Sequence, residues 1–66
     1  MNRYYCLPDE GTIARKKPDN PQFEEYNSET GKWEPNWELS GIYSGDIRSI
    51  LCDTEQEAKD VLQRYK

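Results

Sequence analysis

The two cysteines, Cys6 and Cys52, are the first candidates for chemistry in this chain. They lie far apart in the sequence, so they form neither a C-x-x-C redox motif nor a zinc half-site. Histidine, the commonest general base and metal ligand, is absent. A disulfide would tie the first strand to the start of the last helix, but the cytosol would keep it reduced. The sequence favours two buried free thiols over a disulfide, and indicates no metal and no cofactor.

Carboxylates crowd the middle of the chain. They are Asp19, Glu24, Glu25, Glu29, Glu34 and Glu38. A hairpin would bring Glu24 or Glu25 near Glu34, and two close carboxylates can divide the roles of acid and base. That chemistry needs a deep, desolvated cleft, which a core this small can hardly form. No calcium-loop spacing occurs either. We interpret the carboxylates as a solvated face, and expect no catalytic residue and no enzyme activity.

The only basic run is Arg15-Lys16-Lys17, which a first hairpin would bring near Arg3. It could contact a phosphate or an acidic partner. Such charges at a strand end more often form a solvated edge that discourages sheet-to-sheet pairing. Weak nucleic-acid binding through Arg15–Lys17, or mimicry of a nucleic acid by the acidic face, is therefore the alternative function.

The stretch Trp33–Tyr43 (WEPNWELSGIY) is the strongest candidate for a working surface. Two tryptophans and a tyrosine, interrupted by proline and glycine, cannot all enter one small core. Exposed Trp and Tyr side chains are enriched at protein interfaces. We take Trp33, Trp37 and Tyr43 as the partner-binding residues, with Trp37 and Tyr43 the more exposed pair. The competing interpretation is a cluster of rings that closes the open end of a sheet.

These residues must be positioned by a few short elements, of which the last is the clearest. In Asp53–Lys66, the stripe Ala58, Val61, Leu62 and Tyr65 has the spacing of one helical face. Asp53 or Thr54 can cap this helix. Thr54 and Glu57 have the capping-box spacing.

The preceding chain predicts strands. They are Arg3–Leu7, Thr12–Lys16, Gln22–Tyr26 and Lys32–Glu34, with turns at 8–11 and 27–31. Trp37–Leu39 is a link with room for one helical turn, and residues 46–52 favour a strand over a helix. The expected fold is α+β: a small antiparallel, meander-like sheet of about four strands covered by one C-terminal helix. The expected core is Tyr5, Leu7, Ile13, Phe23, Trp33, Ile42, Ile50, Ala58, Val61, Leu62 and Tyr65.

Size and charge bound the function. Sixty-six residues make one domain, 1–66, and the net charge of -4 disfavours nucleic acid as a partner. No apolar run approaches the ~20 residues of a membrane span, and the N-terminus lacks a signal-peptide core, which predicts a cytoplasmic protein. In size, acidity and lack of catalytic constellations the chain resembles short accessory proteins of bacteria and their phages, without a shared motif. The sequence therefore predicts a small interaction or accessory module that binds another protein or a second copy of itself.

Overall fold

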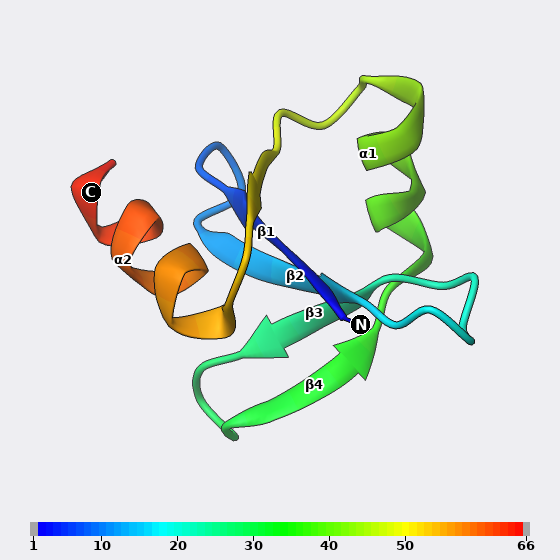
Figure 1. Ribbon diagram of the computed structural model, residues 1–66, viewed down its shortest axis with the longest axis horizontal. Coiled ribbons are helices and arrows are strands. Elements are labelled where there is room, and N and C mark those ends of the chain that lie inside the picture. The colour runs from blue at the N-terminus through cyan, green and yellow to red at the C-terminus, as the bar shows by residue number, and fades with distance from the viewer. Residues whose placement is uncertain (1, 66) are drawn as a thin grey trace.

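A five-stranded antiparallel sheet forms the middle layer of the protein (Figure 1). The computed structural model describes residues 2–65. The strands are β1 (Arg3–Leu7), β2 (Thr12–Lys16), β3 (Glu24–Asn27), β4 (Lys32–Pro35) and β5 (Ile50–Cys52), in the order β4-β3-β2-β1-β5. The predicted α+β class is confirmed, and β1–β4 form the predicted meander. The sheet has five strands instead of about four, because residues 50–52 pair with β1.

The two hairpins turn where the sequence places a glycine. Gly11 has φ +72°, and its N–H donates to the carbonyl of Leu7 (2.9 Å). Gly31 also has φ +72°, and its N–H donates to the carbonyl of Asn27 (2.8 Å). A residue with a Cβ is strained in this left-handed region, so glycine lets each strand reverse within a few residues.

Helix α2 (Glu55–Arg64) covers one face of the sheet. Thr54 is its N-cap: the Glu57 N–H donates to Thr54 Oγ1 (3.1 Å), and the Glu57 carboxylate accepts from the Asp53 N–H (2.7 Å). The predicted cap is thus present, with its second hydrogen bond reaching Asp53. Beneath the helix lies a core cluster. Its buried members are Cys6, Ile13, Cys52 and Ala58, with Trp33, Ile50, Val61 and Leu62 partly buried against them.

Tyr65 does not belong to this core, so its predicted burial is wrong. The helix ends at Arg64, and the Tyr65 side chain is 51% exposed. Its ring lies instead beside the Arg48 guanidinium, 5.3 Å from the ring centre. The last member of the stripe therefore lies at the C-cap of the helix, where the core does not reach it.

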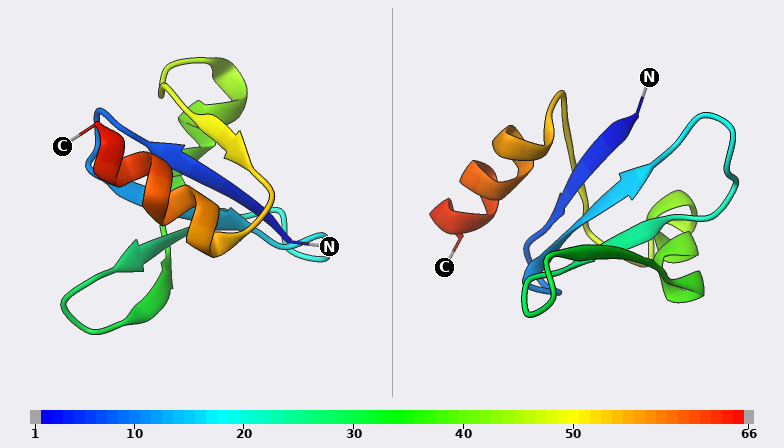
Figure 2. Two further views of the ribbon diagram at one scale, coloured as in Figure 1. Left: turned by 60° about the vertical axis from the view of Figure 1, so that its left-hand side comes forward. Right: turned by 90° about the horizontal axis from the view of Figure 1, so that it is seen from below.

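A second layer, which the sequence did not predict, covers the other face of the sheet. It consists of the 3₁₀ turn η1 (Trp37–Ser40) and the short helix α1 (Gly41–Ser44) (Figure 2). The single helical turn allowed for at Trp37–Leu39 is therefore present. The cluster below this layer comprises Tyr5, Leu7, Ala14, Phe23 and Leu39, with Ile42 and Ile47 packed against it.

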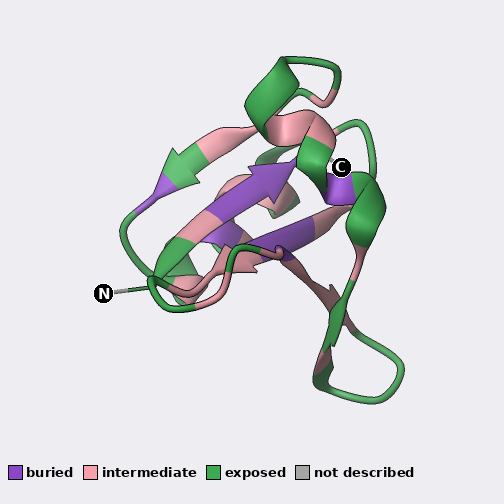
Figure 3. Ribbon diagram, turned by 90° about the vertical axis from the view of Figure 1, so that its right-hand side faces the viewer, coloured by how far each residue is buried: buried purple, intermediate pink, exposed green. Residues whose placement is uncertain are grey.

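The central strands are consequently buried on both faces (Figure 3). Along β1, Cys6 lies on the α2 side and Leu7 on the α1 side, and Ile13 and Ala14 divide in the same way along β2. The expected core included Tyr5, Leu7, Phe23 and Ile42, but the prediction of one covering helix missed that they form a second cluster. Ala14, Leu39 and Ile47 of that cluster were not among the expected core residues.

Candidate functional site

Trp37 and Tyr43 form an exposed aromatic surface on η1 and α1. Trp37 is 79% exposed and Tyr43 66% exposed, so the predicted exposure of this pair is confirmed. The two rings border one small cleft of about 60 Å³, which Pro21 and Phe23 also line. We call Trp37 and Tyr43 together the aromatic surface.

The aromatic surface stands on a fixed base. The ring of Tyr43 lies 4.9 Å from that of Phe23, which in turn meets Tyr5 edge-on at 5.6 Å. Asn36, before Trp37, donates from its side-chain amide to Glu25 (2.8 Å) and accepts from the Glu38 N–H (3.0 Å). Both aromatic side chains are therefore attached to backbone that the core and its hydrogen bonds hold in place, which lowers the entropy lost on binding.

Trp33, the third predicted partner-binding residue, does not join them. It lies opposite Tyr26 in the β3–β4 pair, with ring centres 5.3 Å apart, and faces the α2 side with Tyr4 at 6.2 Å. The Arg15 guanidinium covers its ring at 4.5 Å. Side chains alternate between the faces of a strand, and this alternation puts the sheet between Trp33 and the aromatic surface.

The basic run Arg15-Lys16-Lys17 is divided by the same alternation. Arg15 pairs with Glu24 (Nη2 to Oε1, 3.0 Å), and Lys17 lies 3.9 Å from the same carboxylate oxygen. Lys16 points to the other face, where it stands directly across from Arg3. The predicted proximity of Arg3 to the basic run is thus confirmed, but Arg15 is neutralised within the protein.

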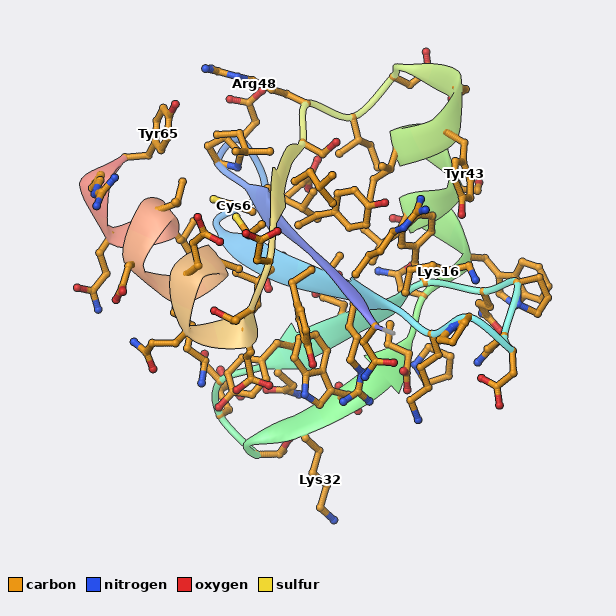
Figure 4. The ribbon with its side chains drawn as sticks, in the orientation of Figure 1. Cys6, Lys16, Lys32, Tyr43, Arg48 and Tyr65 are labelled. Carbon is orange, nitrogen blue, oxygen red and sulfur yellow. The ribbon has the colours of Figure 1, made fainter. Side chains whose placement is uncertain are left out.

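Arg3, Lys16 and Lys17 line an open hollow with a volume of about 690 Å³. Tyr43, Leu51 and Asp53 contribute to the same wall, and Asp53 is the one carboxylate in it. We call this site the basic hollow. Figure 4 shows Lys16 and Tyr43 on the same side of the molecule, so the basic hollow adjoins the aromatic surface.

The predicted carboxylate pair is present on β3 and β4. Glu25 and Glu34 stand opposite each other in β3 and β4, beside an open hollow of about 370 Å³. Each accepts a hydrogen bond from an asparagine side chain, Glu25 from Asn36 and Glu34 from Asn27 (2.8 and 2.9 Å). No group of three or more metal-ligating side chains occurs among residues 2–65. The carboxylates form a hydrogen-bonded, solvated face.

Cys6 and Cys52 are buried free thiols on neighbouring strands beneath α2. Burial raises the pKa of both thiols above the ordinary value of 9.0, and the nearby Glu57 carboxylate raises that of Cys52 further. Because the thiolate is the nucleophile and metal ligand, this environment suppresses cysteine chemistry.

We expect both thiols to resist alkylation in the folded protein at neutral pH and to react fully after denaturation without reductant. Mass spectrometry of the alkylated protein measures this, and recovery of a linked peptide would contradict it.

The raised pKa of the two thiols also predicts that the stability of the protein depends on pH. The unfolded chain loses thiol protons at lower pH than the folded one. The stability that the two thiols contribute is therefore fully present well below pH 9.0 and is lost as the pH rises from there through the folded-state pKa. A Cys6→Ala/Cys52→Ala variant should show a smaller fall.

No helix among the described residues has both the length and the apolar character needed to cross a membrane.

The sequence matches no protein-family model, and comparison with curated proteins and with solved structures found no significant match.

Proposed function

We propose that this protein is a small binding module that recognises another protein through the aromatic surface formed by Trp37 and Tyr43. The observation that carries the proposal is the exposure of these two large rings, 79% and 66%, on a base fixed by Phe23 and Asn36. A domain this small buries only about 60% of the surface of its unfolded chain, so it needs most of its apolar side chains for its core. The solvent exposure of these two rings is explained if a partner covers them.

The size of the cleft favours a protein partner over a small molecule. Ligand pockets typically enclose about 300–1,000 Å³, whereas the space between Trp37 and Tyr43 is about 60 Å³. The rings therefore act as anchors that enter a partner's surface. Nearby Glu38 and Asp46 oppose a phosphate backbone, which makes stacking on nucleic-acid bases the weaker interpretation.

The contact must also extend beyond the two rings. A standard interface covers roughly 800 Å² on each partner, which is about a sixth of the 4595 Å² accessible surface of this protein. An interface of that size centred on Tyr43 includes the neighbouring wall of the basic hollow. The aromatic pair would supply most of the energy and the surrounding residues the specificity.

Replacing Trp37 with alanine should weaken association by about 2 kcal/mol or more, a loss of over tenfold in affinity, with the melting temperature nearly unchanged. Affinity capture from the source cell identifies what binds, and titration with the captured protein, or sedimentation if the chain binds itself, gives the affinity.

Tyr65→Ala is the matched control, because it removes an exposed ring on the α2 side, away from Tyr43 (Figure 4). Equal binding by the two variants would refute the proposal. So would a Trp37→Ala protein that melts much lower but associates normally while folded.

A further inference from the structure

Arg3 and Lys16 are two like charges on the same face of the sheet. They stand directly opposite each other in the β1–β2 ladder, and Lys16 Nζ donates a hydrogen bond to the Lys17 carbonyl (2.6 Å). Neither forms an ion pair with any carboxylate in the part of the chain that the structure describes. Lys17, whose ammonium lies 3.9 Å from Glu24 Oε1, lines the same wall. Two neighbouring cations without a carboxylate partner, beside one hollow, suit an anionic group.

The surrounding charge gives this site its specificity. The protein as a whole is acidic, with a net charge of -4, so its overall field disfavours an acidic partner and a basic site stands out against it. Complementary charge then fixes the orientation in which the partner arrives. Because Tyr43 lines both the basic hollow and the small cleft beside Trp37, a partner on the aromatic surface also reaches the cations.

The wall of the basic hollow includes an open edge of the sheet. β5 is the last strand in the order and pairs only with β1. Its three residues carry no charge, and its middle residue, Leu51, is 62% exposed and lines the hollow. The opposite edge strand, β4, is protected by Lys32, Glu34 and Pro35, as sheet edges usually are. β5 is short, but it carries no charge or proline at its edge, and an open edge beside a specificity pocket is the arrangement that accepts an added strand.

We infer that the partner of the aromatic surface presents an acidic, extended segment. This segment pairs its backbone with β5 and places carboxylates in the basic hollow, against Arg3 and Lys16. The inference rests on the proposed function, since it identifies the chemistry of that same partner. Side chains alternate along a strand, so an acidic residue at every second position would face the cations. A nucleic acid fits less well, because Asp53 lies in the hollow and the sheet-edge contact needs a peptide backbone.

Direct binding of model peptides tests the inference. The probe is a fluorescent peptide of about eight residues, long enough for one strand, in which Glu alternates with Val. The control probe has Lys in place of Glu, and labelled random duplex DNA is the third. We expect saturable binding of the Glu peptide alone. Binding should weaken severalfold on raising the salt concentration, because the contacts are partly exposed charges. Slowed hydrogen exchange of the β5 amides would report strand pairing.

The variants are Lys16→Glu and its control Lys32→Glu, which changes the net charge equally at a site far from the hollow (Figure 4). Lys16→Glu should weaken Glu-peptide binding at least tenfold, while Lys32→Glu should change it less than twofold. Lys16→Glu should also melt at the same temperature or higher, because Arg3 then faces a carboxylate. A purely structural Lys16 would instead lower the melting temperature.

The inference is overturned if the Glu peptide fails to saturate, if the Lys peptide binds equally well, if both charge reversals weaken binding alike, or if DNA binds more tightly. Failure of the proposed function looks different. If Trp37→Ala abolishes capture of the cellular partner while Lys16→Glu has no effect, the aromatic surface binds a partner that is not acidic. If Trp37→Ala and Tyr65→Ala bind alike, the aromatic surface itself is refuted.

Discussion

Replacing Phe23 with alanine should leave little folded protein at room temperature. Phe23 is among the largest fully buried side chains, and its ring contacts Tyr5 in the core and Tyr43 at the surface. Truncating a buried Phe typically removes about 3–5 kcal/mol. That is comparable to the entire stability a core of this size supplies, roughly 3–5 kcal/mol.

Urea denaturation followed by circular dichroism measures the loss. Trp37→Ala is the control, because it also removes an aromatic side chain from the same cleft but from an exposed position, where substitutions usually stay within about 0.5 kcal/mol. A loss for Phe23→Ala as small as that for Trp37→Ala would mean that the α1 side holds no core of its own.

Ala58→Asp should be equally damaging on the other face. Ala58 is completely buried where α2 meets the cluster of Cys6 and Ile13. The side chains of this cluster are aliphatic, aromatic or thiol groups, and a buried charge without a cationic partner costs several kcal/mol. Gln63→Asp, on the exposed side of the same helix, introduces the same charge and should be nearly silent.

The pH dependence of the destabilisation by Ala58→Asp distinguishes a buried charge from overpacking. Burial raises the folded-state pKa of the introduced carboxyl group, so the folded state keeps its proton to higher pH than the unfolded state. The defect of Ala58→Asp should therefore be smallest at acid pH, near the ordinary Asp pKa of about 4, and grow as the pH rises. A defect that is independent of pH would indicate overpacking instead.

The repeating elements of this fold could be predicted from the sequence. Helix α2 and both hairpins follow from a helical stripe, a capping residue and glycines in turns. The α1 layer could not, because four residues of helix show no periodicity. The residues that hold this layer in place also show no recognisable pattern in the sequence. Asn36 caps η1 through its side chain, and Gly41 allows Ile47 to approach, since a Cβ there would lie 2.9 Å from the Ile47 side chain.

The candidate site was predictable only in part, for a related reason. Trp37 and Tyr43 could be expected at the surface because they lie in an irregular link beside proline and glycine. The separation of Trp33 from them depends on which face of the sheet each residue meets, and that required knowledge of a second layer. The like-charge pair of Arg3 and Lys16 follows from the hairpin register, in which Leu7 stands opposite Thr12. The open edge of β5 depends on the contact with β1 that no local pattern encodes.

The pairing of β1 with β5 also determines when the protein can fold during its synthesis. β1 is made before the other described elements, whereas its second neighbour, β5, and the helix that covers Cys6 begin only at Ile50 and Glu55. Closing so long a loop costs entropy before any contact across it is made. Until residues 50–58 have been made, the nascent chain therefore presents the Cys6 face and one edge of β1 to solvent. This interval, in which chaperones or neighbouring chains meet an unfinished sheet, is the period of greatest aggregation risk for the protein.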